Sequence, residues 1–437
     1  MSRPVACSSL VLRGLWSTMI LANTLLLLAC TGQDSASLTH GPFLGSSGPD
    51  HALVWARARS EGEYVLALEA GGERRTVSAM AEEARDMTLC WRVDGLSPGQ
   101  AYDFEVLSGD EVIHADGVLR AGPPEDAPRV RLGFASCAND RRFPRQAGWA
   151  RMLEEGAEAL FLLGDTPYID STELEVQRRR YREFYGMPDV AAALSAVPFH
   201  ATWDDHDFGQ NDTDGRLPGK ERSRQAFVEY HANPSAGEEG AGIYCRVRRG
   251  PIEVFLLDAR TFGGTEPSPA DPERPTLLGT AQWSWLLRSL LDSDAPFKVL
   301  ATGMIWNGAT RPGKRDHWMT YPHERSALFE FLGEENISGV VLLGGDIHRS
   351  RALRYPTEDS VGYPLTELIT SPLANTVIEA ANAPSPYLLH DVGVQESFLL
   401  LEADMEADPP QLTGRCLDAD GVEHFRVELL LPQLRRG

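Results

Sequence analysis

The sequence predicts a mixed chain in which a small all-β module precedes a larger α/β region. Residues 41–122 consist of short runs that alternate apolar and polar residues, the pattern of half-buried strands. From Arg129 onward, strand-like runs alternate with helical segments, which is the signature of an α/β fold. Between the two parts, the prolines of residues 123–128 favour extended backbone and mark a linker.

Size and charge limit the classes of function. The chain has 437 residues, 42% of them hydrophobic, which is enough for a substantial core. Its formal net charge of -22 would repel a phosphate backbone, so we expect no nucleic-acid-binding surface. A small anionic substrate can still bind where metal cations supply local positive charge.

The first 30 residues have the pattern of an export signal. Arg3 and Arg13 precede an apolar run over residues 14–29, which is shorter than the roughly 20 residues of a membrane span. The run ends in Leu27-Leu28-Ala29-Cys30, which resembles a bacterial lipoprotein signal with Cys30 as the lipidated residue. We therefore expect a signal peptide at 1–30, a tether at 31–40 and an exported lipoprotein of the cell envelope, in the periplasm or at a membrane surface. An ordinary cleaved signal and a core helix are the alternatives.

Residues 41–122 are expected to form a β-sandwich. Residues 51–57 and 63–69 are clear alternating strands, separated by glycine and acidic turns. The segment from Gly95 to Tyr102, with its Leu-Ser-Pro-Gly turn, resembles the loop-to-strand corner of fibronectin type III-like domains. The resemblance implies a fibronectin III-like all-β domain here.

Residues 129–437 are expected to form the second domain. Its main helical segments are 146–155, 173–185, 281–291 and 322–334. After about residue 394 the chain returns to paired strands, at 397–402 and 424–430.

Polar residues follow two apolar runs of this domain. Residues 159–163 and 339–343 have the continuous apolar character of buried parallel strands. Side chains that follow such strands meet at one edge of the sheet, where open α/β sheets build their sites. The polar side chains in question are Asp165, Tyr168, Asp346 and His348.

Two further segments carry the same kinds of ligand. Cys137 ends the apolar run 131–137, and the cluster Trp203-Asp204-Asp205-His206-Asp207 is acidic. Carboxylate, imidazole, thiolate and phenolate groups bind metal cations, and a bridging carboxylate lets two cations lie close together. The sequence therefore predicts a metal site, with Asp165 as the candidate bridge.

Several blocks in a fixed order carry a resemblance to a known family. They are Ala135-Ser136-Cys137, Gly164 to Tyr168, Trp203 to Asp207, Leu257-Asp258-Ala259-Arg260, Trp318 to Arg325 and Gly345-Asp346-Ile347-His348. With these blocks, residues 41 to about 430 resemble the PhoD-like family of alkaline phosphatases and phosphodiesterases. That family is related to the purple acid phosphatases within the metallophosphoesterases. The resemblance implies a four-layered αββα metallophosphoesterase sandwich.

The resemblance also implies a ligand set. A ferric ion, Fe³⁺, would be held by Cys137, Asp165, Tyr168 and His348. A second cation, Ca²⁺ or another divalent ion, would be held by Asp165, by Asp205 or Asn211, and by Asp346. Asp205 occupies the asparagine position of the generic Gly-Asn-His motif, whereas Asn211 is the better amide ligand, so both remain candidates.

The expected chemistry is hydrolysis of phosphate mono- or diesters by a metal-activated water. His206 is the candidate general acid, and His206 and Asn211 are the candidate contacts to the substrate phosphate. Substrates of the family extend to phospholipids and teichoic acid, so small esters and such lipids or polymers are candidate substrates, with a lipid anchor placing the protein at the membrane.

Each residue taken alone has a simpler interpretation. Cys137 would be a buried strand cysteine, Asp204 and Asp205 a helix cap, and Asp258 with Arg260 a structural ion pair. Their joint position after buried strands favours a site. Two other functions remain open: a binding lipoprotein that has lost the chemistry, and a metallohydrolase of a non-phosphate ester.

Overall fold

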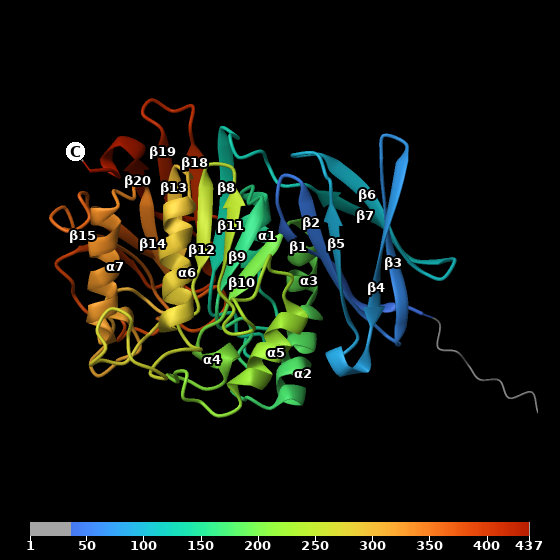
Figure 1. Cartoon of the computed structure of the whole chain (residues 1–437), viewed down its shortest axis with the longest axis horizontal. Helices are drawn as coiled ribbons and strands as arrows, with labels where there is room; N and C mark the ends of the chain where they lie inside the picture. Colours follow the sequence, from blue (N-terminus) through green and yellow to red (C-terminus); the bar gives the residue numbers. More distant parts are fainter. Residues whose placement is uncertain (1–35, 437) are drawn as a thin grey trace, which may run out of the picture. The chain divides into compact units, whose positions relative to one another are not determined.

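Two β-sheets form the centre of the α/β region (Figure 1). This computed structural model describes residues 36–436. The predicted signal peptide with Cys30, and residues 31–35 of the predicted tether, lie outside the described residues. None of the helices within 36–436 is both long and apolar enough to span a membrane.

The first sheet has six strands in the order β10-β9-β8-β18-β19-β20. Its strands are β8 (Arg129–Ala135), β9 (Ala159–Leu163), β10 (Phe199–Thr202), β18 (Ser397–Asp404), β19 (Gln411–Asp418) and β20 (Glu423–Leu430). Strands β8, β9 and β10 are parallel, whereas β18, β19 and β20 extend the sheet in antiparallel fashion. The carboxyl ends of β8, β9 and β10 therefore lie at one edge.

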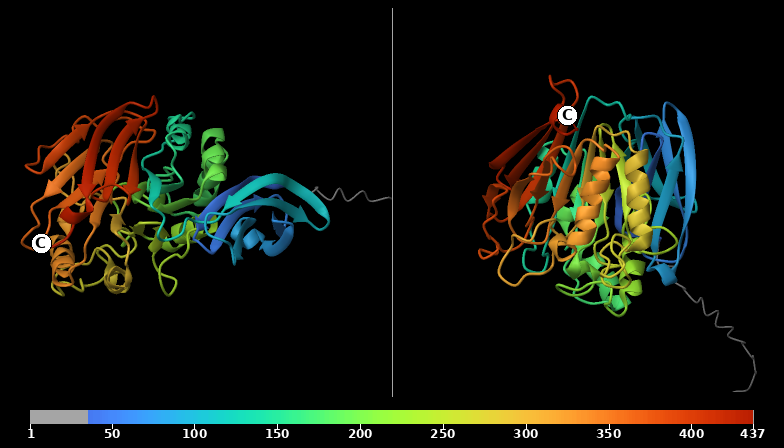
Figure 2. Two further views of the ribbon diagram at one scale, coloured as in Figure 1. Left: turned by 90° about the horizontal axis from the view of Figure 1, so that it is seen from above. Right: turned by 60° about the vertical axis from the view of Figure 1, so that its left-hand side comes forward.

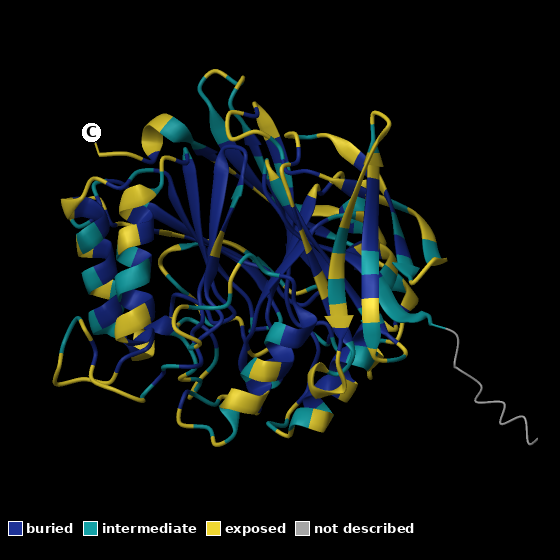
Figure 3. Ribbon diagram, turned by 45° about the vertical axis from the view of Figure 1, so that its right-hand side comes forward, coloured by how far each residue is buried: buried dark blue, intermediate teal, exposed yellow. Residues whose placement is uncertain are grey.

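The second sheet has seven strands in the order β11-β12-β13-β14-β16-β15-β17. Its strands are β11 (Cys245–Arg249), β12 (Ile252–Leu256), β13 (Phe297–Ala301), β14 (Val340–Gly344), β15 (Ser350–Tyr355), β16 (Leu365–Ile369) and β17 (Leu388–Val392). Strands β12, β13, β14 and β16 are parallel. One apolar core contains residues of both sheets, and their central strands are buried along most of their length (Figure 3).

Helices pack against each sheet (Figure 2). They are α1 (Gly148–Glu154), α2 (Leu174–Tyr185), α3 (Pro188–Ala196), α4 (Asp205–Phe208), α5 (Lys220–Tyr230), α6 (Gly279–Asp292) and α7 (Pro322–Glu334). Helices α6 and α7 share the core of the two sheets, while α1, α2, α3 and α5 share a second cluster with β9 and β10. The predicted mixed α/β fold is confirmed, and the four expected helices lie within a few residues of their predicted bounds. Three short 3-10 helices, η1 (Glu83–Arg85), η2 (Trp318–Thr320) and η3 (Leu431–Gln433), complete the elements described.

The N-terminal part forms two antiparallel sheets with a core of their own. One contains β1 (Leu38–Ser47), β2 (His51–Ala58) and β5 (Thr88–Asp94); the other contains β3 (Gly62–Ala70), β4 (Glu73–Ala81), β6 (Ala101–Ser108) and β7 (Glu111–Arg120). Strand β1 begins at Leu38, inside the segment 31–40 that the sequence predicts as a tether. The predicted tether therefore extends too far, because residues 38–40 already belong to β1, where Leu38 pairs with Ala58 of β2.

Trp55 of β2 joins the N-terminal sheets to the α/β region. Its ring stacks on Phe43 at 5.4 Å between centroids and meets the edge of Tyr185, on α2, at 5.3 Å. Its indole Nε1 donates a hydrogen bond to the carbonyl oxygen of Glu229, at 2.8 Å. The side chain is buried, and Trp55 belongs to the cluster that contains α2 and α5. Packing across this junction should couple the unfolding of the two parts.

Replacing Trp55 by alanine should therefore lower the free energy of unfolding by about 3 to 5 kcal/mol, the usual cost of truncating a buried aromatic residue. Urea denaturation followed by tryptophan fluorescence and circular dichroism measures this change. The control is Met80→Ala, since Met80 is 56% exposed on β4. A loss below about 1 kcal/mol in Trp55→Ala would show that the junction contributes little.

Candidate metal centre

The structure brings the predicted ligands together at the carboxyl ends of the parallel strands. Cys137 follows β8, Asp165 follows β9, Asp205 begins α4 after β10, and Asp346 follows β14. Ligand atoms of Cys137, Asp165 and His348 lie within 4.8 Å of one another, and so do those of Asp204, Asp205 and Asp346. Both sheets therefore contribute ligands to one centre.

Local backbone geometry turns the ligands toward this centre. Cys137, Asp165, Asp346 and His348 have φ values of 58°, 54°, 67° and 52°, in the left-handed region that residues other than glycine seldom adopt. Gly164 lets the turn after β9 lie close to the turn after β10, because a Cβ atom at position 164 would lie 2.3 Å from the backbone nitrogen of Asp204. Such conformations at several neighbouring positions are typical of functional sites.

One half of the centre contains the thiol of Cys137, the phenol of Tyr168 and the imidazole of His348. The Sγ of Cys137 lies 3.5 Å from Oδ2 of Asp165, and the hydroxyl of Tyr168 lies 2.9 Å from Nε2 of His348. The Nδ1 of His348 is 2.7 Å from the carbonyl oxygen of Thr376 and donates to it, which leaves Nε2 unprotonated in the neutral ring. Burial lowers the pKa of His348 to about 4, so the ring is neutral at physiological pH, as a metal ligand must be.

The other half contains carboxylates. Burial, and then the charges of Asp205 and Asp204, hold the pKa of Asp165 well above its usual range. Burial raises the pKa of Asp346 to about 7, although the ammonium of Lys314 acts in the opposite direction. Asp205 Oδ1 and Asp346 Oδ2 are buried and accept no hydrogen bond from any residue between 36 and 436. Clustered carboxylates with unused buried oxygens fit a divalent cation and are costly without one.

Asp205 and Asn211 differ in their surroundings. Asp205 is buried and contributes to three of the four acidic or histidine clusters found in residues 36–436, whereas Asn211 is exposed in the turn after α4. The backbone nitrogen of Asp212 donates to Oδ2 of Asp205 at 2.7 Å, which ties this turn to the cluster. This placement favours Asp205 as the ligand, and the choice stays a prediction.

His206 lies at the mouth of the centre. Its Nδ1 is 2.5 Å from Oδ1 of Asp170, and its ring centroid is 4.3 Å from that of Tyr168. One ring nitrogen lies within 4.8 Å of carboxylate oxygens of Asp165 and Asp205. Burial by itself lowers the pKa of His206, but the hydrogen bond to Asp170 and the charge of Asp205 more than offset it and leave the pKa above its usual value. The contact with Asp170 thus stabilises the imidazolium form of His206 relative to a free histidine.

The interpretation of Asp258 and Arg260 as an ion pair is wrong. Asp258 accepts hydrogen bonds from the indole of Trp203 and from backbone nitrogens that include that of Arg260 itself. The fully buried guanidinium of Arg260 instead bridges Asp204 and Asp316, with Nε 2.8 Å from Asp204 Oδ1 and Nη2 2.7 Å from Asp316 Oδ2. The guanidinium therefore neutralises one carboxylate of the centre.

Lys314 is a residue that the sequence analysis missed. Its Nζ lies 2.6 Å from Asp212, 3.3 Å from Asp346 and 3.6 Å from Asp316, and its side chain is 3% exposed. It lies in the loop after β13, 13 positions beyond the end of that strand, so no local pattern marks it. The lysine supplies a fixed positive charge beside the predicted site of the second cation.

Comparisons with known proteins agree with this geometry. The family model described as PhoD-like phosphatase matches residues 132–402, which is more than half of the chain. The chain belongs to the PhoD-like phosphatase family. The resemblance found in the sequence is thereby confirmed.

One curated relative and two solved structures are also similar to this chain. Alkaline phosphatase D of Bacillus subtilis (strain 168) is 27% identical over an alignment of 368 residues, and the match covers 72% of this chain and 61% of that relative. The matched region thus spans about three fifths of the length of the relative. A solved structure of PhoD covers 90% of this chain and 88% of its own, with 20% identity and a TM-score of 0.71. The purple acid phosphatase PPD1 from yellow lupin (Lupinus luteus) covers 89% and 74%, with 12% identity and a TM-score of 0.68. Both structures show the shared fold.

Burial of the Asp346 carboxyl predicts an unusual pH dependence for the metal-free protein. Since the pKa of Asp346 is about 7 when folded, and its ordinary value is 3.8, the folded state holds a proton that the unfolded state releases between these values. The carboxyl of Asp346 therefore costs stability progressively as pH rises from about 4 to 7. In chelator-treated protein, Asp346→Asn should raise the melting temperature at pH 7.5 and leave it nearly unchanged at pH 4.

The matched control is Asp110→Asn, which alters an exposed turn between β6 and β7. Thermal melts from pH 4 to 8 measure both variants. A difference between wild type and Asp346→Asn that is independent of pH would contradict the account.

Proposed function

We propose that this protein hydrolyses phosphate esters at a centre of two metal cations. The observation that supports the proposal is the convergence of Cys137, Asp165, Tyr168 and His348 with the acidic cluster of Asp205 and Asp346. Similarity to alkaline phosphatase D supports the same reaction class.

The donor types suggest two unlike cations. Thiolate and phenolate ligands from Cys137 and Tyr168 favour Fe³⁺, whereas the oxygen-rich cluster with Asp205 or Asn211 and Asp346 favours Ca²⁺, Mg²⁺ or Mn²⁺. When bound, the cations would supply Lewis acidity, which lowers the pKa of water and neutralises charge on the phosphate.

Asp165 lies between the Cys137 side of the centre and the acidic cluster that contains Asp205. Its Oδ2 lies 3.5 Å from the Sγ of Cys137, while Oδ1 accepts a hydrogen bond from the backbone nitrogen of His206 at 3.3 Å. The two oxygens thus face the two ligand groups. This arrangement supports Asp165 as the bridging ligand.

His206 is the proposed general acid. The contact between Nδ1 and Asp170 orients the ring and favours its protonated form, which leaves Nε2 to donate a proton to the departing alkoxide. His206, with Asn211 at the exposed turn, is also the proposed contact for phosphate oxygens. Ser136, the serine next to Cys137, is not activated as a nucleophile by a base among residues 36–436. Its hydroxyl donates to the carbonyl oxygen of Thr370 at 2.7 Å. A covalent phospho-enzyme is therefore not part of the proposal.

Replacing Asp165 by asparagine should remove both cations and abolish hydrolysis. The bridging charge is lost while the shape of the side chain is kept. Metal analysis and turnover of aryl phosphate mono- and diesters measure the effect, with Asp359→Asn, in the loop before β16, as the surface control. A variant that keeps its metals and its turnover would exclude Asp165 as the bridge.

Replacing His206 by asparagine should lower kcat by about 10²- to 10⁴-fold for alkyl esters, as expected for loss of a general acid. The decrease should be much smaller for p-nitrophenyl esters, because their leaving group needs no proton. The control is His51→Asn, a surface histidine that contacts Asp50. An equal loss for both classes of ester would assign His206 to substrate binding alone.

Domain organisation is part of the proposal. We propose a fibronectin III-like domain at residues 41–122, a linker at 123–128 and a four-layered αββα catalytic domain at 129–437. The seven N-terminal strands divide as β1-β2-β5 and β4-β3-β6-β7, and Tyr102 accepts a hydrogen bond at its hydroxyl from the backbone nitrogen of Ser97, at 2.9 Å. A contact of a tyrosine hydroxyl with the backbone a few residues upstream is typical of the tyrosine corner of such sandwiches and supports the assignment.

Export as a lipoprotein and action on phospholipid or teichoic acid-like polymers rest on the sequence resemblance alone. If Cys30 carries the lipid, Cys30→Ser expressed in a bacterial host should move the protein from the membrane fraction to the soluble fraction. Immunoblots of the two fractions measure this. An unchanged distribution would contradict lipid anchoring.

A further inference from the structure

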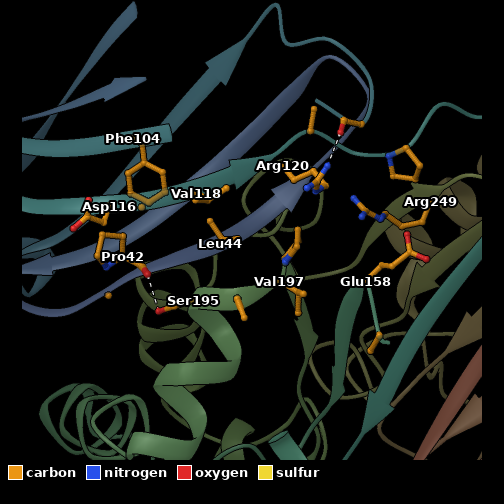
Figure 4. Close-up of a pocket in the computed structure, with 18 of the residues that line it drawn as sticks. Pro42, Leu44, Phe104, Asp116, Val118, Arg120, Glu158, Ser195, Val197 and Arg249 are labelled. Carbon is orange, nitrogen blue, oxygen red and sulfur yellow. Dashed lines mark hydrogen bonds between the residues drawn. The ribbon is translucent and has the colours of Figure 1, made fainter. Parts of the chain in front are cut away.

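A cavity of about 690 Å³ lies between the N-terminal sheets and the α/β region (Figure 4). Strands β1, β6 and β7 supply one wall, and the end of α3, the residues before β9 and β10, and the end of β11 supply the other. Its volume falls in the range of small-molecule binding sites. None of the predicted metal ligands lines it.

The cavity and the metal centre lie at opposite ends of the same strands. Glu158 precedes β9 and Pro198 precedes β10, and both line the cavity. Asp165 and Asp204 follow these strands at their carboxyl ends. At about 3.3 Å per residue, Glu158 and Asp165 are roughly 20 Å apart, so a small ligand in the cavity cannot touch the metal ligands.

One end of the cavity is mainly apolar. Phe104 and Leu44 are 4% and 2% exposed and form part of its wall, together with Pro42 and Val118. The hydroxyl of Ser195 donates to the carbonyl oxygen of Pro42 at 2.9 Å and joins the two sides (Figure 4). Asp116 lies beside Phe104, at the end remote from Arg249 (Figure 4).

The other end contains a buried guanidinium with an unused donor. Arg249 is 4% exposed, and its Nη1 donates to the carbonyl oxygen and the hydroxyl of Ser47, at 3.0 and 2.8 Å. Among residues 36–436 its Nε has no hydrogen-bond partner, but this atom is buried, so a ligand in the cavity can reach only the terminal nitrogens of the guanidinium. The nearby Glu158 accepts a hydrogen bond from the backbone nitrogen of Arg131 at 3.1 Å.

A buried positive charge is costly unless it is compensated, and the nearby carboxylate of Glu158 offsets the burial of Arg249 only in part. Burial lowers the pKa of Arg249 to about 10, which still leaves the group protonated at neutral pH. Arg120, whose Nη1 donates to the carbonyl oxygen of Gly99 at 2.9 Å, lines the same cavity. Two guanidinium groups next to an apolar wall match an anionic group on an apolar body.

We propose that this cavity is a second binding site, separate from the metal centre, which takes an amphiphilic carboxylate. The carboxylate pairs with Arg249 and Arg120, and the apolar part lies against Phe104 and Leu44. The chain as a whole is strongly acidic, with a net charge of -22, and Asp116 and Glu158 also line the cavity, so the anionic group binds at the two arginines, at the end remote from Asp116.

Isothermal titration calorimetry with decanoate tests the proposal. The purified metal-loaded protein is titrated without added phosphate, and the Val118→Trp variant distinguishes binding in the cavity from binding at the metal centre. We expect one saturable site per chain, and binding of decanol, which lacks the charge, at least about tenfold weaker. Absence of saturable binding, or equal affinity for decanoate and decanol, would overturn the proposal.

Two matched tryptophan variants locate the site. Val118 and Val112 both lie on β7 and are 51% and 45% exposed, but only Val118 lines the cavity. Val118→Trp should fill the cavity and weaken decanoate binding at least about tenfold, whereas Val112→Trp should not change it. Both variants should keep the phosphoesterase activity of the wild type. Equal decanoate binding in the two variants would place the ligand elsewhere.

Arg249→Lys tests the charge contact, because lysine keeps the charge but lacks the planar fork of guanidinium donors. We expect decanoate affinity to fall at least about tenfold at an unchanged melting temperature. An unchanged affinity would remove Arg249 from the site. If this variant does not fold, the decanol comparison and the Val118→Trp variant decide the question on their own.

Discussion

Repulsion among carboxylates at one buried sheet edge is the constraint on which this structure depends. Asp165, Asp204, Asp205 and Asp207 are buried together, and the side chain of Asp346 beside them is 10% exposed. Burying like charges is costly unless each is neutralised or hydrogen-bonded. Three are compensated by the chain itself: Arg260 pairs with Asp204, Lys314 lies beside Asp346, and the backbone nitrogen of Asp204 donates to Asp207 at 2.6 Å. Asp165 and the remaining oxygens of Asp205 and Asp346 are left for metal cations, so the deficit of positive charge is what defines the centre.

The two-sheet fold makes this concentration of charge possible. Parallel strands from both sheets end at the same edge, and the turns that follow place their ligands in left-handed backbone conformations. The core shared by the two sheets holds these strand ends in position, while Gly164 lets the turns after β9 and β10 come into contact. Placement of the ligands that follow the strands thus depends on packing far from the centre.

Local patterns in the sequence identified the parts of the site that follow strands directly. The apolar run 159–163 is strand β9 itself, and Asp165 follows it where expected. The partners of Arg260 were missed because the guanidinium reaches Asp204 and Asp316, each 56 positions away, and only the folded route of the chain brings them together. Lys314 was missed for the same reason. Helix α5 was missed because its sequence, Lys-Glu-Arg-Ser-Arg-Gln-Ala-Phe-Val-Glu-Tyr, is too polar to show a clear apolar stripe, although Phe227 and Tyr230 are buried.

The central claim is that Cys137 and Tyr168 bind iron while the acidic cluster binds a second, harder cation. Metal analysis of the purified protein together with its visible absorption spectrum tests this claim most directly. The account predicts iron and a divalent cation in near-equal amounts, and a visible band that Cys137→Ser shifts and Tyr168→Phe removes or weakens. The control Cys416→Ser, which changes a buried cysteine on β19, should leave the band unchanged. A colourless, iron-free protein with full phosphoesterase activity would contradict the account.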